Sequence, residues 1–177
     1  MKKIEEELKS VIRDVPDFPK KGIVFKDITP IMLNPKLSEK VLVELVDLYK
    51  NKGITKVAGI ESRGFLFGYP LAIRLGVPFI LIRKKGKLPY EKVTFDYSLE
   101  YGTASIEMHK DAVSSEDKIL IHDDLLATGG SASAAAELVN MCGGKVVGFN
   151  FLVNLSFLNG PAVLRKYTEN ITNFVEY

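Results

Sequence analysis

Apolar residues recur along much of the chain at the three- and four-residue spacing of an amphipathic helix. In the first dozen residues, the apolar positions Ile4, Leu8 and Ile12 would lie on one face of a helix. A longer stripe begins at Leu37 and would end before Gly53, a residue type that commonly terminates helices. We expect four main helices, at residues 1–12, 37–52, 65–75 and 131–141.

Short apolar runs alternate with these helices and predict the strands of a sheet. The runs KVAGI, PFILI and KILIHD are apolar almost throughout, instead of alternating between apolar and polar positions. Strands of that kind are buried on both faces, as in parallel sheets that are covered by helices. An α/β fold is therefore predicted, with a mostly parallel central sheet flanked by helices on both faces. Strands are expected at residues 56–60, 78–82, 104–110, 118–123, 146–153 and 171–175.

Two segments interrupt this alternation. Residues 17–35 contain three prolines and Gly22, which prevent a long helix, so an irregular loop with one short strand is expected there. Residues 84–98, KKGKLPYEKVTFDYS, are polar and basic and have no clear helical or strand period. Connections of that length inside a compact domain are usually functional or mobile, and we interpret this one as a flexible lid.

Length, charge and cysteine content narrow the class of protein. The 177 residues, of which 46% are hydrophobic, fit a single domain spanning residues 1–177. The formal net charge of +2 is too small for a surface that follows a nucleic-acid backbone. Cys142 is the only cysteine, which excludes an intrachain disulfide and favours a reducing compartment. Since no apolar run is long enough for a signal peptide or a membrane span, we expect a cytoplasmic protein without nucleic-acid or membrane partners.

The segment from residue 119 to residue 139 carries the most informative chemistry. An apolar strand ends in two adjacent carboxylates, and the turn Thr-Gly-Gly-Ser then leads into an alanine-rich helix. Gly129 and Gly130 leave backbone amides uncovered at the N-terminus of this helix, where an anion is favoured. The hydroxyls of Thr128 and Ser131 add further donors, so the turn is suited to binding phosphate. It is not a Walker A loop, because Ser131 stands where that motif has lysine.

The two carboxylates belong to Asp123 and Asp124, at the end of the strand. Such a pair can accept hydrogen bonds from vicinal ribose hydroxyls and place negative charge beneath a developing sugar cation. Either acid alone could instead cap the following helix or be a solvated surface charge. A pentose that carries a 5-phosphate and two free hydroxyls needs both the acids and the turn, so their ordered combination favours a sugar phosphate.

The sequence DDLLATGG and its flanks resemble the motif with which type I phosphoribosyltransferases bind 5-phosphoribosyl-1-pyrophosphate (PRPP). DDLLATGG resembles the adenine-specific branch in particular, and the resemblance extends from about Asp17 to the last strand. It implies the type I fold, with an N-terminal helix and a base-binding hood in residues 1–35 and a core in residues 36–177. It also implies a homodimer, and a magnesium ion held mainly by PRPP instead of by a protein cage.

Carried over to matching positions, the resemblance implies that Asp123 and Asp124 bind the ribose hydroxyls. Two positions depart from the family pattern: Ser131 replaces the commoner threonine but keeps the hydroxyl, and His122 replaces an aliphatic strand residue. His122 is either a hydrogen-bonded structural residue, which we favour, or a perturbation of the acids beside it. The residues implied to bind the 5-phosphate are Ala127, Thr128, Gly129, Gly130 and Ser131.

GIESRGFLFG, at residues 59–68, resembles the pyrophosphate loop of the same enzymes and places Arg63 between a strand and a helix. Arginine suits a multidentate oxyanion, although a surface ion pair is the simpler alternative. The resemblance implies that Ser62 and Arg63 bind pyrophosphate and that the peptide bond between them is cis. Basic residues that follow the next strand are expected to neutralise the remaining phosphate charge; they are Arg83, Lys84 and Lys87.

FPKKGIVFKDITP, at residues 18–30, resembles the adenine-recognition segment of the family. Phe25 offers an aromatic face on which a purine can stack, although ordinary core packing is the alternative. Main-chain groups around Val24 and Lys26 would read the edge of the base. Lys26 replaces an arginine that is common in relatives, which matters only if its side chain contacts the base.

The last motif is YSLEYG, at residues 97–102. The resemblance makes Glu100 the candidate proton acceptor near the reacting nitrogen of the base and Tyr101 a cover for the site, with Arg63 as the third catalytic residue. The activity implied is transfer of the phosphoribosyl group of PRPP to adenine, giving AMP and pyrophosphate. Transfer to an oxopurine is the nearest alternative. A regulatory protein that senses metabolites and binds nucleic acid is another, but it would leave Glu100 and Arg63 without a purpose.

Overall fold

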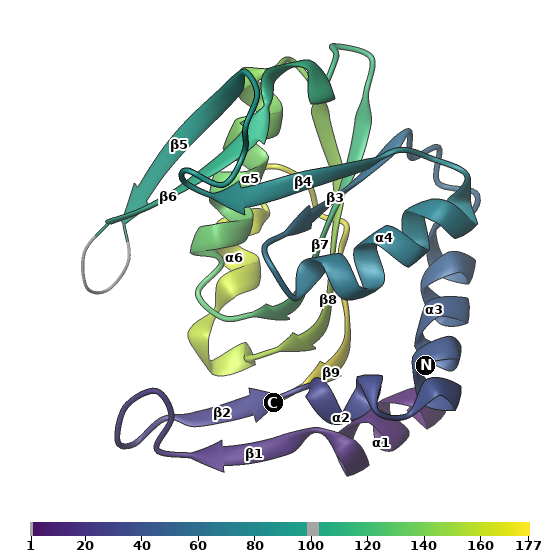
Figure 1. The fold of residues 1–177 in the computed structure, drawn as a ribbon. Helices are drawn as coiled ribbons and strands as arrows, with labels where there is room; N and C mark the ends of the chain where they lie inside the picture. Colours follow the sequence, from purple (N-terminus) through teal and green to yellow (C-terminus); the bar gives the residue numbers. More distant parts are fainter. Residues whose placement is uncertain (1, 99–102) are drawn as a thin grey trace.

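The computed structural model describes residues 2–98 and 103–177 of the chain (Figure 1). All predicted helices and strands are present, with ends shifted by a few residues. None of the helices in the described residues has the length and apolar content needed to cross a membrane. Two short 3-10 helices lie at Lys110–Ala112 and Ser156–Leu158. The other elements, in chain order, are α1 (Lys2–Val11), β1 (Arg13–Pro16), β2 (Val24–Asp27), α2 (Thr29–Met32), α3 (Pro35–Tyr49), β3 (Lys56–Ile60), α4 (Gly64–Leu75), β4 (Phe79–Lys84), β5 (Lys92–Ser98), β6 (Thr103–His109), β7 (Lys118–Leu126), α5 (Gly130–Met141), β8 (Lys145–Asn154), α6 (Gly160–Leu164) and β9 (Ile171–Glu176).

The centre of the molecule is a seven-stranded sheet with the order β5-β6-β4-β3-β7-β8-β9. Strands β4, β3, β7, β8 and β9 pair in parallel, whereas β6 runs antiparallel to both β4 and β5. The prediction of a mostly parallel sheet is therefore confirmed. Because neighbouring parallel strands end at the same edge, the loops after β3, β4 and β7 share that edge, where ligands bind in sheets of this kind.

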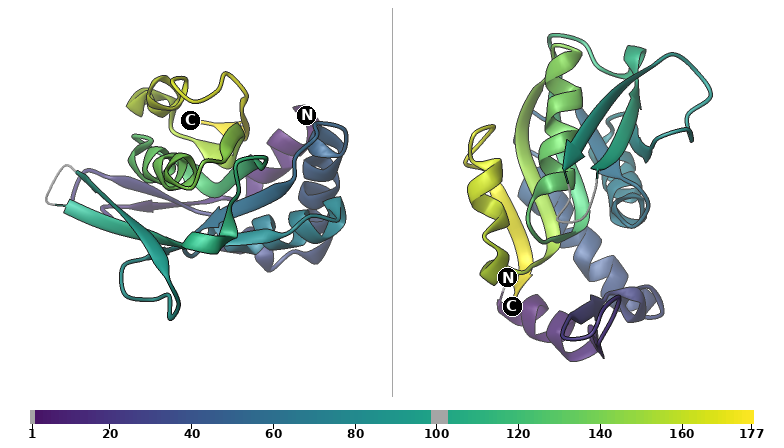
Figure 2. Two further views of the ribbon diagram at one scale, coloured as in Figure 1. Left: turned by 90° about the horizontal axis from the view of Figure 1, so that it is seen from above. Right: turned by 90° about the vertical axis from the view of Figure 1, so that its left-hand side faces the viewer.

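Helices cover both faces of this sheet (Figure 2). Along β7, Ile119 and Ile121 are buried in one hydrophobic cluster with residues of α5. Leu120, between them, is buried in a second cluster with residues of α1, α3 and α4. Four alanines of α5 are buried, and their small side chains let this helix lie close to the strands. The uninterrupted apolar strands of the sequence thus reflect a core on each side of the sheet.

The predicted absence of a strand period in residues 84–98 is wrong for the second half of this segment. β5 pairs with β6 along its whole length and forms an arm at one end of the sheet (Figure 1). Val93, Phe95 and Tyr97 alternate with polar residues and pack against the α5 cluster. This is the two-residue period of a strand with one solvated face. The segment is therefore a turn followed by a strand.

The N-terminal segment forms a separate two-stranded sheet, at the bottom of Figure 1. β1 and β2 pair in antiparallel fashion, with Val15 opposite Phe25. α2 follows, and Asp27 accepts hydrogen bonds from both the amide and the hydroxyl of Thr29. The sequence predicts an irregular loop with one short strand in residues 17–35 and excludes only a long helix. With four residues, α2 is too short to show a helical period.

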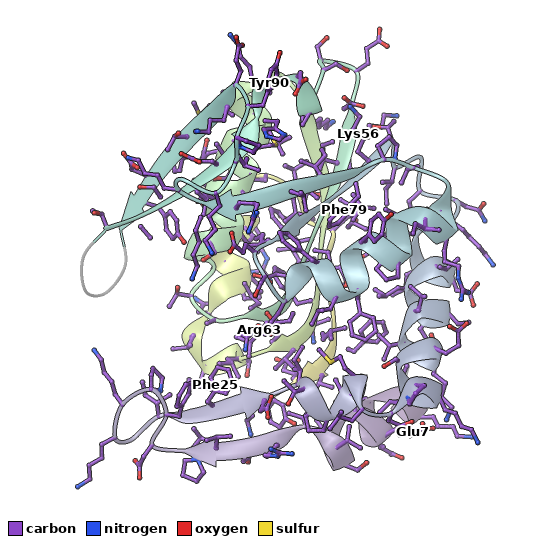
Figure 3. All side chains as sticks on the ribbon, in the orientation of Figure 1. Glu7, Phe25, Lys56, Arg63, Phe79 and Tyr90 are labelled. Carbon is purple, nitrogen blue, oxygen red and sulfur yellow. The ribbon has the colours of Figure 1, made fainter. Side chains whose placement is uncertain are left out.

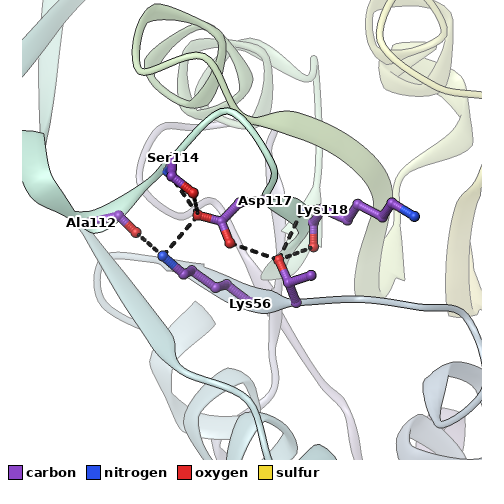
Figure 4. A network of polar contacts seen from close by, with 6 residues as sticks. Lys56, Ala112, Ser114, Asp117 and Lys118 are labelled. Atoms are coloured by element: carbon purple, nitrogen blue, oxygen red, sulfur yellow. Dashed lines mark hydrogen bonds and ion pairs between the residues drawn. The ribbon is translucent and has the colours of Figure 1, made fainter.

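A buried ion pair fixes the opposite, amino-terminal edge of the large sheet (Figure 4). Lys56 Nζ, at the start of β3, lies 2.9 Å from Asp117 Oδ2, just before β7. Asp117 also accepts hydrogen bonds from the amide and hydroxyl of Ser114 and from the hydroxyl of Thr55. Burial opposes the ionisation of Asp117, but Lys56 and these hydrogen bonds outweigh it and hold the pKa well below its usual value. The fold supplies every partner, so this carboxylate is structural.

Candidate functional site

The Thr-Gly-Gly-Ser turn lies where β7 ends and α5 begins. Gly129 has a φ of 85°, a left-handed conformation that glycine adopts without strain. A Cβ atom on Gly129 would also lie 2.9 Å from the carbonyl oxygen of Gly160, at the start of α6. No side chain fits at this position. The amides in the first turn of α5, which have no acceptor within the helix, are therefore left uncovered.

Residues of this turn line a hollow of about 90 Å³. Its lining includes all five residues predicted to bind phosphate, together with Asp123 from β7 and Phe151 from β8. α5 is 12 residues long, so the positive end of its dipole adds to the attraction for an anion. The size of the hollow, its amides and the helix end suit one compact phosphate group.

Asp123 and Asp124 lie beside the start of α4. Arg63 Nε is 2.9 Å from Asp124 Oδ2. Asp123 Oδ1 would be 3.1 Å from a Cβ atom placed on Gly64, and it accepts a hydrogen bond of 2.9 Å from the amide of Asp124. The fold thus brings the acids at the end of β7 against the loop after β3, and so joins two motifs that are about 60 residues apart in the sequence.

Burial makes both acids harder to ionise than exposed carboxyl groups. The pKa of Asp123 is raised well above its usual value by burial and by the negative charge of Asp124. Burial also raises the pKa of Asp124, against the opposing charge of Arg63. Asp124 Oδ2 is buried and receives no aligned hydrogen bond from the described residues, so its contact with Arg63 is an ion pair only. Two crowded acids with an unused acceptor favour a ligand that brings hydrogen-bond donors or positive charge.

Arg63 connects the large sheet to the N-terminal hairpin. It is the residue before α4, and its guanidinium carbon lies 5.2 Å from the centre of the Phe25 ring (Figure 3). This distance is within the range of a cation–π contact. With Asp124 on one side and Phe25 on the other, Arg63 lies between the residues predicted to hold the sugar and the residue predicted to stack on the base.

The cis peptide bond of this loop joins Glu61 to Ser62. The prediction of a cis bond between Ser62 and Arg63 is therefore wrong by one position. Ser62 and Arg63 already belong to the turn that begins α4: the amide of Phe65 donates to the Ser62 carbonyl, and Arg63 has helical backbone angles, with φ of −73° and ψ of −25°.

Glu61, directly after β3, is a partly buried carboxylate that was not among the predicted site residues. It accepts hydrogen bonds from Arg83 Nε at 3.2 Å, from Lys87 Nζ at 3.0 Å and from the Lys84 amide at 2.9 Å. Burial opposes its charge, but these hydrogen bonds outweigh burial and lower the pKa of Glu61 to about 2. The basic residues predicted to meet pyrophosphate are thus gathered next to Ser62. The only sequence signal that could have identified Glu61 was its position within the GIESRG motif.

Phe25 and Val24 lie at the start of β2 in the hairpin. Phe25 is half-buried and meets Phe18 edge to face, with 5.2 Å between the ring centres. Val24 is exposed. Phe25 belongs to neither of the two hydrophobic clusters of the sheet, so packing in these clusters does not account for it. A half-buried ring with a cation beside it leaves room for a flat apolar ligand.

The side chain of Lys26 points away from Phe25, as expected for neighbouring residues of a strand. Lys26 Nζ lies 2.6 Å from Asp14 Oδ1 and 3.7 Å from the centre of the Tyr177 ring. These contacts tie the hairpin to the end of β9. Because the protein itself holds the side chain, any contact of Lys26 with a base would come from its main chain.

Glu100 and Tyr101 lie outside the described residues. Shortly before them, Tyr97 of β5 reaches the phosphate turn, where its hydroxyl is 3.1 Å from Ser131 Oγ. Tyr97 was not among the predicted site residues: it is the first residue of the YSLEYG motif, but only Glu100 and Tyr101 of that motif were given a role, and its partner is 34 positions away in the sequence.

His122 is fully buried one residue before the acids. Its Nδ1 lies 2.8 Å from Asn150 Oδ1, and Asn150 Nδ2 donates to Thr172 Oγ1 at 2.9 Å. Because the amide oxygen of Asn150 can only accept, His122 donates through Nδ1. Burial lowers the pKa of His122 to about 4, so the ring is neutral near pH 7. The structural interpretation of His122 agrees with these surroundings.

The acid pair was tested for its fit to a magnesium ion. Among residues 2–98 and 103–177, no group of three or more His, Cys, Asp or Glu side chains could hold a metal ion. Asp123 and Asp124 offer hard oxygen ligands, and none of the described residues donates a hydrogen bond to Asp124 Oδ2. Such a pair fits a magnesium ion that takes most of its ligands from a phosphorylated substrate and from water.

Known proteins resemble this chain in sequence and fold. The phosphoribosyl transferase domain family matches residues 26–167 of the chain. An adenine phosphoribosyltransferase of Ureaplasma parvum is 50% identical over 167 residues, which cover 94% of this chain and 96% of the relative.

Two crystal structures extend the comparison to the fold. The adenine phosphoribosyltransferase of Thermoanaerobacter pseudethanolicus superimposes with a TM-score of 0.93 at 48% identity, covering 97% of this chain and 99% of the other. The enzyme of Saccharomyces cerevisiae has a TM-score of 0.90 at 38% identity, covering 98% of this chain and 99% of the other. That structure is a complex with adenine and D-2,5-dideoxy-2,5-imino-altritol 1,6-bisphosphate.

Proposed function

Because the chain belongs to the phosphoribosyltransferase family, and within it to the adenine phosphoribosyltransferases, we propose that it transfers the 5-phosphoribosyl group of PRPP to adenine. The products are AMP and pyrophosphate, so the reaction salvages a free purine base. One observation carries this proposal: at the carboxyl edge of the sheet, Arg63 contacts both Asp124 and Phe25, and Asp123 lines the same hollow as the phosphate turn.

The phosphate turn, residues 127–131, is assigned to the 5-phosphate of PRPP. The acid pair is assigned to the ribose, because vicinal hydroxyls supply the donors that Asp124 Oδ2 lacks. As the bond to pyrophosphate lengthens, the sugar ring gains positive charge. A carboxylate already placed beneath the ring stabilises that charge without rearrangement, which lowers the barrier to transfer.

Ser62 and Arg63 are assigned to pyrophosphate, together with Arg83, Lys84 and Lys87. The Arg63 side chain is 39% exposed, and among the described residues its contacts are an ion pair with Asp124 and the ring of Phe25. The pyrophosphate of PRPP offers it a multidentate partner instead, and leaves Asp124 to the ribose. Glu61 holds Arg83 and Lys87 beside the loop, where their charge can stabilise the departing group.

Phe25 is assigned to one face of adenine, with main-chain groups of Val24 and Lys26 reading the edge of the base. A carbonyl acceptor at that edge would favour the exocyclic amine of adenine over the oxygen of an oxopurine. Glu100 is assigned to the proton that the attacking base must lose, and Tyr101 to covering the site. The roles of Glu100 and Tyr101 rest on the resemblance of YSLEYG to the family motif.

We also propose that PRPP binds together with magnesium. The ion supplies positive charge next to the leaving pyrophosphate. Asp123 and Asp124 are the residues placed to contact it, directly or through water. The fit rests on their oxygen ligands and on Asp124 Oδ2, which accepts no hydrogen bond from the described residues.

A homodimer and a cytoplasmic location complete the proposal. On α4, the side chains of Leu66, Tyr69 and Ile73 are 46%, 55% and 60% exposed. They follow one another at helical spacing and form an apolar stripe, a feature typical of interfaces between subunits. A reducing cytoplasm would keep the single cysteine, Cys142, as a free thiol.

The choice of base is tested by supplying PRPP with adenine, hypoxanthine, guanine or xanthine in separate reactions and measuring nucleotide formation. We expect AMP from adenine, with kcat/KM about 10³-fold or more above that for any oxopurine, because the wrong edge leaves polar groups unpaired. Preference for an oxopurine would refute the assignment of adenine as the base, but the protein would still be a phosphoribosyltransferase. Gel-shift binding of nucleic acid without turnover of any base would instead favour a regulatory protein.

A further inference from the structure

Tyr97 joins two parts of the molecule that the sequence motifs treat separately. It lies near the end of β5, and its hydroxyl is 3.1 Å from Ser131 Oγ in the phosphate turn. Its ring also covers the turn, because a Cβ atom on Gly130 would lie 3.7 Å from the Tyr97 ring. Neither PRPP-binding motif contains Tyr97, and no role has been assigned to it above.

A bound phosphate would determine which hydroxyl donates the hydrogen bond between Tyr97 and Ser131. A serine hydroxyl has a single proton and two acceptor sites. If Ser131 gives its proton to a phosphate oxygen, its own oxygen is free to accept, and the hydroxyl of Tyr97 is the donor within reach. A donor behind the serine polarises its hydroxyl and strengthens the bond in front of it.

We propose that Tyr97 is a positioning residue for the 5-phosphate: it donates to Ser131 Oγ and so directs the Ser131 proton into the phosphate turn. This inference deepens the proposed function and rests on it. Ser131 needs a partner that fixes its hydroxyl, because serine lacks the second γ substituent that restricts χ1 in threonine. Without an external partner, the Ser131 hydroxyl would be divided among several rotamers.

A purely structural tyrosine would not need this hydroxyl. Val93 and Phe95, the preceding inward residues of β5, pack against the α5 cluster with apolar side chains only. Tyr97 packs against the same cluster, so phenylalanine would serve for packing alone. Among these three inward residues of β5, only Tyr97, which lies where the strand reaches the phosphate turn, has a hydroxyl. This position favours a role of the hydroxyl in phosphate binding instead of in core packing.

The test is a double-mutant cycle with Tyr97→Phe and Ser131→Ala. Binding of ribose 5-phosphate and of pyrophosphate is measured separately by isothermal titration calorimetry at fixed ionic strength. Tyr97→Phe is expected to weaken ribose 5-phosphate binding about 3- to 10-fold, the effect of one hydrogen bond, and to leave pyrophosphate binding unchanged. In the Ser131→Ala background, Tyr97→Phe should have no further effect.

Tyr90→Phe is the matched control. Tyr90 lies just before β5, its side chain is 62% exposed, and it packs against His109 instead of the phosphate turn. This variant should bind ribose 5-phosphate like the wild type. Thermal unfolding of all variants verifies that each is folded, since replacing tyrosine by phenylalanine keeps the ring.

Three results would overturn the inference. They are an unchanged ribose 5-phosphate affinity in Tyr97→Phe, an equal loss of pyrophosphate affinity, and an additive effect in the Ser131→Ala background. AMP formation by the wild type separates this failure from that of the proposed function. If the wild type forms AMP but the effects of Tyr97→Phe and Ser131→Ala are additive, only the proposed role of Tyr97 is refuted. If the wild type formed no AMP, the proposed function and the role of Tyr97 would both fall.

Discussion

Asp124 combines three properties at the scale of a single residue: it is buried, it faces a cation, and one of its oxygens lacks a hydrogen-bond donor. Burial without a full set of partners costs free energy, which a ligand with donors would recover. Asp117 is also a buried acid, but the fold supplies all of its partners. The contrast distinguishes a carboxylate suited to a ligand from one that only stabilises the sheet.

Single residues were predictable where a local motif marks them. The acid pair and the phosphate turn are contiguous, and the structure brings them to one site. Glu61 and Tyr97 lie within quoted motifs, but their partners are 22 to 34 residues away, and only strand pairing and the packing of α5 bring these residues together. The side chain of Lys26 was left open by the sequence, and its partners Asp14 and Tyr177 come from β1 and from the end of the chain.

His122 predicts how stability depends on pH. Its pKa is about 4 in the folded protein against about 6.5 in an unfolded chain. The unfolded chain therefore takes up this proton first as the pH falls. The stabilising effect is complete above pH 6.5 and is lost progressively toward pH 4. This single group should remove roughly 3 kcal/mol from the free energy of unfolding across that range, measured by urea denaturation.

His122→Val isolates that contribution. The variant should lose the part of the acid dependence that belongs to His122. It should also be about 1 to 3 kcal/mol less stable at pH 7, because Asn150 Oδ1 loses its donor. Adding Asn150→Leu removes the second partner and should recover part of that loss. An acid dependence as steep in His122→Val as in the wild type would contradict the pKa shift.

At the scale of elements, the pattern of apolar residues located the main helices and central strands. Each of these helices buries a long apolar stripe, and each of these strands buries a continuous apolar run. β5 was missed because charged and polar residues occupy its solvated face, although Val93, Phe95 and Tyr97 keep the strand period. β1, α2 and α6 have four or five residues each and depend on contacts from elsewhere in the chain. Elements that short carry too few positions to establish a period.

The turn between β7 and α5 predicts the effect of Gly129→Ala. Alanine at this position would be strained by the left-handed φ, and its Cβ atom would clash with the carbonyl oxygen of Gly160. The turn must therefore move, and its amides no longer point in a common direction. Ribose 5-phosphate affinity should fall by about tenfold or more, together with a loss of about 1 to 2 kcal/mol of stability. Gly53→Ala is the control.

Gly53 also has a left-handed φ, of 66°, but a Cβ atom there would have no neighbour within 4 Å. Gly53→Ala should therefore lose a similar amount of stability from backbone strain alone and keep its ribose 5-phosphate affinity. Calorimetric binding and thermal unfolding on both variants give the comparison. Unchanged affinity in Gly129→Ala would show that the turn does not hold the phosphate.

At the scale of the whole molecule, the two edges of the sheet have different tasks. The amino-terminal edge is fixed by Lys56 and Asp117, while the carboxyl edge keeps its acids and cations incompletely paired. The N-terminal hairpin adds Phe25 to that edge through the contact with Arg63. A buried carboxylate oxygen without a full set of hydrogen bonds from the described residues thus lies where a substrate would bind, on a rigid sheet that holds it in place.

The central claim is that the acid pair and the phosphate turn act on one sugar phosphate. It is tested most directly by the rate of AMP formation from adenine and PRPP in the wild type and in Asp124→Asn, with the exposed Asp111→Asn as control. The wild type and Asp111→Asn should form AMP at equal rates. In Asp124→Asn, kcat/KM should fall on the order of 10²-fold or more, because the amide cannot supply negative charge beneath the sugar. Full activity in Asp124→Asn, or no AMP from the wild type, would contradict the claim.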